Sequence, residues 1–255
     1  MPGSVFLIDY HNQQRVLGEL LRESSSRSNF YFLLTCSAVI ATIGLLVNNP
    51  VFVIGGMLVA PILFPVLSLA MAVVTFSRLA LYRSIFTLIR ATGLIILASF
   101  FVTLLAGWEE IDVFGEMFFR VEPNLLFFFV ALAAGSAVSY TWIKQDLSAA
   151  LPGVAVSVSL VPPLTAAGIG LAFGNTAIVT GAMSVFLIDL IGIVASAILI
   201  FFLFGFSDLQ ELEEQKIVEE KLEEKIQKQA VQEAKVVAKD QPKKESPRGD
   251  NPDCS

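Results

Sequence analysis

Long apolar stretches separated by short polar ones run from Phe30 to Phe206. A bilayer core of about 30 Å is crossed by about twenty apolar residues in helical form. Six stretches have this length and composition: 30–47, 51–75, 84–106, 124–143, 149–173 and 176–206. Because lipid offers no partner to unpaired backbone groups, spans of this length are expected to be helices. The pattern therefore predicts an all-α integral membrane protein with six transmembrane helices in residues 30–206.

Polar segments flank this membrane domain on both sides. Residues 1–29 form a leader in which apolar and polar residues alternate loosely at helical spacing, and we expect it to be an amphipathic helix on the cytoplasmic membrane surface. Residues 207–240 carry many Glu/Lys pairs and predict a charged cytoplasmic helix. Residues 241–255 contain three prolines among charged residues and are expected to be disordered.

The Lys and Arg residues beside the membrane predict the orientation of the chain, since cytoplasmic loops carry an excess of them. Only Arg120 lies on one side, in the third loop, whose other charges are acidic. Nine lie on the opposite side: Arg15, Arg22, Arg27, Arg78, Arg83, Lys144, Lys216, Lys221 and Lys225. Both termini are therefore expected in the cytoplasm.

Composition narrows the functions to consider. Charged residues make up 16% of the chain and the net charge is −6, which argues against a nucleic-acid partner. One histidine, His11, and two cysteines in no metal-ligand pattern predict neither a metal site nor a cofactor. The chain also lacks a zinc-protease motif, an activated serine constellation and a phosphate-binding loop, so we do not expect an enzyme.

The two halves of the membrane domain resemble each other. An offset of 101 positions places Pro61 on Pro162, and an offset of 99 places Arg90 on Asp189. Each half, about 30–106 and 124–206, has three predicted crossings, so the second would be inverted relative to the first. Proline-interrupted helices at matching places in inverted halves indicate the binding site of a transporter.

Proline has no N–H, so the carbonyl four residues before it loses its helical partner. The expected substrate-binding residues are those around the two interruptions: Gly55, Gly56, Pro61, Pro65, Ser157, Ser159, Pro162 and Pro163. The alternative is a pair of closely packed, kinked helices with no path, because Pro and Gly are frequent in membrane helices.

Arg90 and Asp189 are the ionisable residues well inside the predicted spans, and they complete the candidate site. A charge at the centre of a membrane helix costs about 2.5–3.5 kcal/mol on insertion scales. The two side chains would either pair with each other or flank a substrate. For Arg90, reaching back to the inner membrane surface is a third alternative.

Several strings of residues resemble a prokaryotic membrane family known as domain of unknown function 389. They are Ala41–Leu45, Val53–Pro61 with Pro65, Ala150–Val156, Leu160–Leu164 and Ala166–Leu171, and the resemblance extends over about Ser28 to Phe206. Gly56 departs from the expected Ala. The resemblance implies a multi-pass protein of the prokaryotic cell membrane and supplies no substrate or reaction.

Two functions remain open from the sequence. The first is a transporter or channel for a small solute or ion, with its path near the second and fifth helices. The second is a membrane scaffold or assembly protein that acts through its C-terminal helix, with membrane lipid and further copies of the chain as partners. Gly170 and Gly174, four residues apart, would permit close helix association in such a homo-oligomer.

Overall fold

The computed structural model describes residues 10–23, 28–106, 125–144, 160–209 and 215–219, with positions 222 and 226. Within these residues every regular element is a helix. The chain divides into two units, Met1–Glu214 and Gln215–Ser255. In the described part of the second unit, residues 215–219 are helical.

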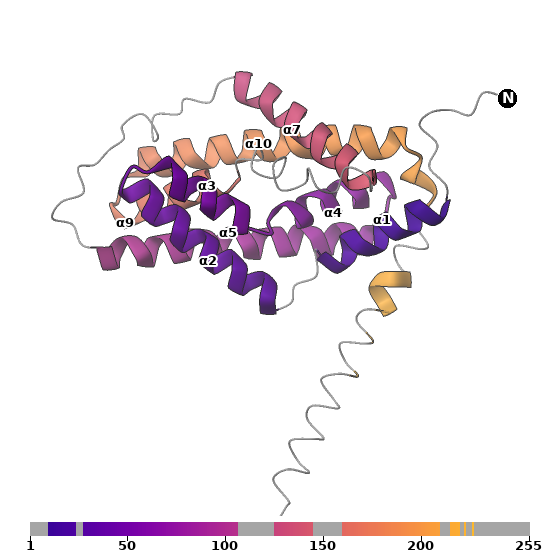
Figure 1. The fold of residues 1–255 in the computed structure, drawn as a ribbon, viewed down its shortest axis with the longest axis horizontal. Coiled ribbons are helices and arrows are strands. Elements are labelled where there is room, and N and C mark those ends of the chain that lie inside the picture. The colour runs from indigo at the N-terminus through magenta and orange to yellow at the C-terminus, as the bar shows by residue number, and fades with distance from the viewer. Residues whose placement is uncertain are drawn as a thin grey trace, which may run out of the picture. The chain divides into compact units, whose positions relative to one another are not determined.

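The first unit is a bundle of helices (Figure 1). Its elements are α1 (Tyr10–Glu23), α2 (Ser28–Leu46), α3 (Pro50–Val59), α4 (Leu63–Val74), α5 (Arg78–Ala106), α7 (Leu125–Ile143), α9 (Val161–Ala172), α10 (Thr176–Leu203) and the 3-10 turn η2 (Phe206–Asp208).

Four helices, α2, α5, α7 and α10, are long and apolar enough to cross a membrane. Helices α3 and α4 together have the length of a fifth span, which is bent by 52° at its break. Helix α9 is too short to cross alone, and residues 149–159 before it lie outside the described part of the chain. The described residues thus contain four or five of the six predicted spans.

Helix α5 begins at Arg78, well before the predicted start at residue 84. The reason is local: Ser77 Oγ accepts a hydrogen bond from the Ala80 amide at 3.3 Å, which caps the helix at its first turn. Arg78 and Arg83 therefore belong to the helix and not to a loop.

Helices α5 and α10 run in opposite directions, with α4 and α9 at opposite ends of the pair (Figure 1). Helix α4 leads directly into α5 and also contacts η2, which follows the C-terminus of α10. Helix α9 leads into the N-terminus of α10 and packs on the second half of α5, where Gly168 lies against Ile96 and Ser99. The short helices α4 and α9 thus each contact both long helices, α5 and α10.

The hairpins α4–α5 and α9–α10 have matching backbones. Helices α4 and α9 are both 12 residues long and start 98 positions apart. Their C-caps have nearly the same torsions, φ −82° and ψ −4° at Thr75 and φ −83° and ψ −3° at Phe173. A residue of positive φ follows in each, Phe76 at 56° and Gly174 at 66°. Equivalent residues of the two hairpins are therefore 98 positions apart in the sequence, whereas the alignment of Pro61 with Pro162 used an offset of 101 positions.

Small residues let the other helices approach closely, as is common in membrane bundles. A Cβ atom on Gly192 of α10 would lie 2.7 Å from the Cβ of Ala131 on α7. A Cβ atom on Gly44 of α2 would lie 2.7 Å from the Val53 amide nitrogen on α3. Glycine is required at both crossings because a larger side chain would push the helices apart.

Helix α1 is amphipathic, as predicted, but its apolar face packs against protein. Val16, Leu17 and Leu20 are fully buried, and the helix contacts α4 and α7. Gln13 Nε2 donates hydrogen bonds to the carbonyls of Phe204 and Gly205, both at 3.1 Å. The leader helix is therefore docked on the bundle through its apolar face, which differs from the predicted placement of that face on the membrane surface.

Candidate functional site

The predicted interruption of the second helix is present. Helix α3 ends at Val59, Ala60 is extended with φ −73° and ψ 120°, and α4 begins at Leu63. Pro61 lies in this break. The sequence therefore located the break correctly.

The carbonyls that the prolines were expected to leave free in this helix have local partners. The Met57 carbonyl accepts from the Ala60 amide at 3.3 Å, and the Pro61 carbonyl accepts from the Phe64 amide at 3.4 Å. Both bonds are longer than the usual 2.9–3.0 Å and are correspondingly weak. The corresponding carbonyls of Val158 and Ser159, and the Ser157 and Ser159 hydroxyls, lie outside the described residues.

Pro65, Pro162 and Pro163 lie in the first turns of α4 and α9, and all three are buried. The first amides of a helix have no intrahelical acceptor, so a proline there breaks no hydrogen bond. The N-terminus of a helix also carries the positive end of its dipole. At the start of α4 the polar character is therefore that of a positive helix end rather than of free carbonyls, and α9 likewise begins with the positive end of its dipole.

The two helix starts lie at the same depth in the bundle. Because a helix rises about 1.5 Å per residue, residues equally far from a hairpin turn lie side by side. In the α4–α5 hairpin this places Leu63 level with Ile89. Helix α9 runs parallel to α5 with Gly168 beside Ile96 and Ser99, so its start lies level with about Ala91. The starts of α4 and α9 therefore differ in depth by only about 3 Å.

Asp189 of α10 lies at this same depth. In the α9–α10 hairpin, a Cβ on Gly170 would lie 2.9 Å from Ile178 Cγ2, which fixes the register of the two helices. The same register places Val161 beside Leu187. Asp189 lies two residues further along α10, or about 3 Å, and is therefore level with the break between α3 and α4. Asp189 is 7% exposed and lies on the buried face of α10. Within the described residues its carboxylate is in no ion pair.

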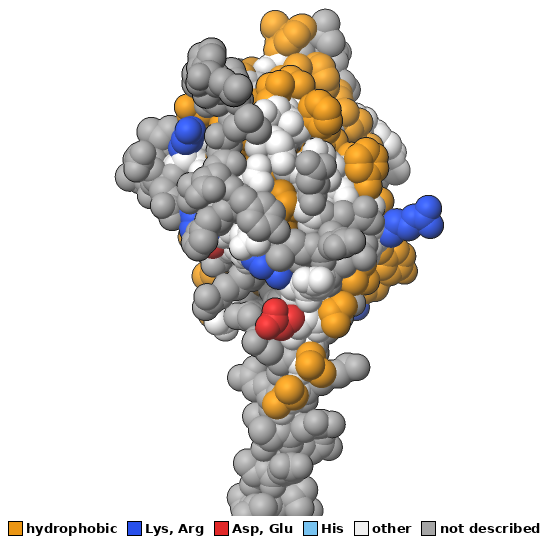
Figure 2. All heavy atoms as spheres, turned by 90° about the vertical axis from the view of Figure 1, so that its right-hand side faces the viewer, with side chains coloured by type: hydrophobic (Ala, Val, Ile, Leu, Met, Phe, Trp, Pro, Cys, Tyr) orange, Lys and Arg blue, Asp and Glu red, His pale blue; other side chains and the backbone are white. Residues whose placement is uncertain are grey.

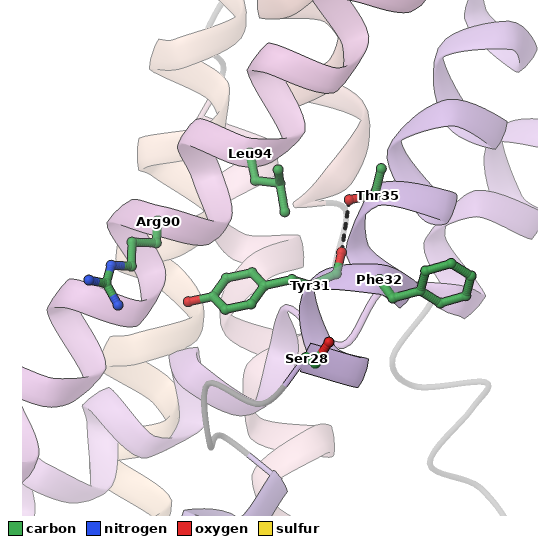
Figure 3. A pocket seen from close by; sticks show the side chains of 6 residues that line it. All are labelled: Ser28, Tyr31, Phe32, Thr35, Arg90 and Leu94. Atoms are coloured by element: carbon green, nitrogen blue, oxygen red, sulfur yellow. Dashed lines mark hydrogen bonds between the residues drawn. The ribbon is translucent and has the colours of Figure 1, made fainter. Parts of the chain in front are cut away.

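Arg90 lies elsewhere. It is exposed on α5, with its guanidinium carbon 4.1 Å from the centre of the Phe86 ring. It lines an open groove between α5 and the start of α2 (Figure 3). The described structure does not bring Arg90 and Asp189 into an ion pair, and Ala91, not Arg90, is the counterpart of Asp189 at 98 positions.

The two predicted glycines differ in their surroundings. Gly56 is buried against α2, where a Cβ would lie 2.8 Å from that of Ala41, and its carbonyl accepts from Ser37 Oγ at 2.7 Å. Gly55 has nothing within 4 Å of where its Cβ would be. Gly56 therefore holds α3 on α2, whereas Gly55 leaves space beside the helix.

Trp142 of α7 was not among the predicted residues. Its ring meets that of Phe64, the second residue of α4, edge to face at 5.3 Å. Its indole N–H is buried and has no acceptor in the part of the chain that the structure describes. A tryptophan inside an apolar span was the signal available, because its N–H needs a partner when buried.

Basic side chains collect at one end of the bundle. Arg15 of α1, Arg78 and Arg83 of α5, and Lys144 after α7 belong to segments that lie at this end in Figure 1. Figure 2 looks at the bundle from this end and shows Lys and Arg side chains on several sides of it. Hydrophobic side chains lie along the right-hand side of this view.

The family described as Domain of unknown function (DUF389) matches residues 57–195, more than half of the chain. The chain belongs to this family. The matched region begins in α3 and ends in α10, so it includes the break, both short helices and Asp189.

The DUF389 chain is also similar to an uncharacterized protein, MJ0678, of the archaeon Methanocaldococcus jannaschii. The two are 28% identical over 184 residues, which cover 71% of this chain and 56% of that protein. The chain thus spans little more than half the length of this relative. No solved structure matches the chain.

Proposed function

We propose that this DUF389 protein is a carrier or channel for a small solute or ion, with its path at the break where α4 and α9 begin. One observation carries the proposal: two half-length helices approach from opposite ends of the bundle and start at the same depth. Discontinuous helices whose broken ends meet within the membrane form the binding sites of many transporters.

The matching hairpins support an architecture of two inverted three-helix repeats. The order α2, α3–α4, α5 would correspond to α7, the segment ending in α9, and α10. Part of the packing follows this exchange, since α2 contacts α5 as α7 contacts α10, and α4 and α9 both contact α5 and α10. The proposal includes a sixth span made by α9 with the residues before it, and these residues lie outside the described part.

Asp189 would be the charged group of this path. A buried carboxylate without an ion pair is costly unless a cation, a proton or helix dipoles compensate it. The positive ends of α4 and α9 at the same depth supply part of this compensation. The Trp142 N–H near the start of α4, which has no acceptor among the described residues, would add a hydrogen-bond donor for a solute.

The basic end of the bundle supports a cytoplasmic location of both termini in a prokaryotic cell membrane. Arg15, Arg78, Arg83 and Lys144 lie on segments at this end, together with α1. Labelling of single cysteines introduced at Arg78 and at Thr176, at opposite ends of the bundle, would test this orientation in intact cells. Accessibility of residue 176 from the outside, with protection of residue 78, is the expected result.

The function is tested by thermal unfolding of the detergent-purified protein against a panel of inorganic cations, inorganic anions and small metabolites. A ligand present at 100 times its dissociation constant stabilises the native state by about 2.7 kcal/mol. The panel is repeated with Asp189→Asn, which resembles the protonated carboxyl. Ser184→Ala on the same helix is the control, because Ser184 bonds only locally, to the Thr180 carbonyl at 2.8 Å.

The Asp189→Asn variant separates the classes of solute. A cation held by the carboxylate would lose its effect on Asp189→Asn and keep it on Ser184→Ala. An anion bound together with a proton would keep its effect on both variants. The transport proposal fails if no compound stabilises the native protein, or if none of the stabilising compounds is moved across the membrane of proteoliposomes.

The second candidate function, a membrane scaffold, is favoured by one observation in the second unit. Val218, Leu222 and Ile226 recur every four residues and are each 57% exposed. An exposed apolar stripe on a helix can bind another helix. Removing residues 207–255 would abolish a scaffold's activity and leave solute binding by the bundle intact.

A further inference from the structure

Arg90 lies in a place that the proposed path does not use. The groove that it lines has a volume of about 550 Å³ and is open to the outside of the bundle. Its walls come from α2 (Ser28, Tyr31, Phe32 and Thr35) and from α5 (Arg90 and Leu94). Figure 3 shows the Tyr31 ring reaching from α2 toward Arg90, with its hydroxyl end facing the guanidinium.

The groove joins one cation to an apolar surface. Arg90 is in no ion pair within the described residues, and its contact there is with the face of Phe86 on its own helix. Around it the outer surface of α5 is apolar, with Tyr82, Phe86 and Ile89 exposed. A cation bordered by exposed aromatic and aliphatic side chains is complementary to a molecule with an anionic head and hydrocarbon chains.

The depth of Arg90 fits the headgroups of one membrane leaflet. The uncharged helix from Ala91 to Ala106 is about 24 Å long, at 1.5 Å per residue. A hydrocarbon core of about 30 Å then ends roughly 6 Å beyond Arg90, toward Arg83 and Arg78. A long arginine side chain can reach over that distance to the polar boundary. Helix α2 also begins here, at Ser28.

We propose that the groove between α2 and α5 binds an anionic phospholipid, with its phosphate on Arg90 and an acyl chain along Leu94 and the flank of α5. The guanidinium presents a planar set of N–H donors that matches phosphate oxygens. The site lies on the outside of the bundle, in the leaflet on the basic side, and is independent of the solute path.

The test uses the full-length protein, delipidated in a neutral detergent and titrated with phosphatidylglycerol or with phosphatidylcholine of the same acyl chains. Bound lipids are counted by native mass spectrometry, and thermal unfolding is followed in parallel. Phosphatidylglycerol is expected to bind and stabilise more than phosphatidylcholine. Inorganic phosphate alone is expected to have no effect, because it lacks the chain that occupies the groove.

Arg90→Gln is expected to weaken phosphatidylglycerol binding about tenfold. Arg78→Gln, an equal loss of charge at an exposed position of the same helix outside the groove, is expected to bind as the native protein does. Arg90→Lys is expected to retain the preference for phosphatidylglycerol. Leu94→Trp, which fills the groove and keeps the cation, is expected to reduce binding and provides the test if Arg90→Gln does not fold.

Three results would overturn the proposal. Equal binding of the two lipids would show that charge does not select the occupant. Equal losses for Arg78→Gln and Arg90→Gln would show a diffuse attraction to the basic end. Stabilisation by inorganic phosphate alone would show a site for free anions, with no role for the acyl chain.

Discussion

The hairpins α4–α5 and α9–α10 have nearly the same backbone and different polar groups. Their short helices have equal length, and their turns have nearly equal torsions. Yet the buried position at this depth is Ala91 on α5 and Asp189 on α10. The difference teaches that the shared backbone serves packing, whereas the charge belongs to one hairpin alone.

The largest loss of stability is expected when the α4–α5 hairpin also receives a buried carboxylate, as α9–α10 has in Asp189. Ala91 is fully buried, so Ala91→Asp would place a second carboxylate inside the bundle, at a cost of about 2.5–3.5 kcal/mol. The yield of monodisperse protein and its unfolding temperature should both fall. Ala91→Ser is the matched control, because a hydroxyl can bond to the preceding turn of its own helix. Similar unfolding temperatures for the two variants would contradict a tightly packed, dry position at residue 91.

A second difference is the contact that each short helix makes with the long helix of the other hairpin. Gly168 of α9 lies so close that a Cβ would be 2.6 Å from the Ile96 carbonyl oxygen, whereas its counterpart on α4 is Ala70. Gly168→Ala is expected to destabilise the protein by about 1–3 kcal/mol through overpacking. Gly181→Ala on α10, with nothing within 4 Å, is the control and should be neutral or slightly stabilising. Thermal unfolding followed by tryptophan fluorescence measures both.

The turns differ in strain. Phe76 has a φ of 56°, which is costly for a residue with a Cβ, whereas Gly174 has a φ of 66° at little cost. Gly174→Ala should therefore destabilise by about 1–2 kcal/mol. Phe76→Gly should stabilise by about 1 kcal/mol or less, because relief of strain is partly offset by the greater freedom of unfolded glycine. The Phe76 ring is 75% exposed, so little packing is lost. If the unfolding temperatures of Gly174→Ala and Phe76→Gly change in the same direction, the difference in strain between the two turns is contradicted.

The smallest effect is expected at the caps. Asn175 Oδ1 accepts from the amides of Ala177 and Ile178 at 3.1 and 3.3 Å. Asn175→Ala should cost about 1 kcal/mol. Asn175→Asp, which keeps the acceptor, should restore most of this stability. Denaturant unfolding measures the free energy of unfolding of the native protein and of both variants, and equal losses for Asn175→Ala and Asn175→Asp would contradict a role of the side-chain acceptor.

The sequence predicted the fold where hydropathy and helix breakers decide it. The apolar stretches located the long helices, and Pro61 located the break. The start of α5 was misplaced because Arg78 and Arg83 were assigned to a loop, although a serine cap permits a helix to begin with charged residues. The two hairpins match at 98 positions, whereas the offsets of 101 and 99 were set by prolines and by charged residues, and the inverted repeat itself stays a prediction.

The candidate site stays a prediction, but the structure shows where several of its residues lie. Pro65, Pro162 and Pro163 are first-turn residues of the two short helices, where a proline breaks no hydrogen bond of its own amide. Arg90 and Asp189 were grouped because both are charged and 99 positions apart. Which side of a helix faces the bundle depends on its neighbours, and so a uniformly apolar helix gives no sequence signal that Arg90 is exposed and Asp189 buried. The Trp142–Phe64 contact likewise joins distant segments.

The docking of α1 has a consequence for biogenesis. Gln13 bonds to carbonyls 191 and 192 positions later in the chain, at the end of α10. At about 5–20 residues per second of synthesis, the leader helix emerges roughly ten seconds or more before that partner exists. Helix α4 is made early and can cover the apolar face of α1 during this interval, as it does in the finished bundle. The two bonds of Gln13 form only after residues 204 and 205 exist, and a chain whose synthesis stops before residue 204 therefore lacks this link between its first helix and the end of α10.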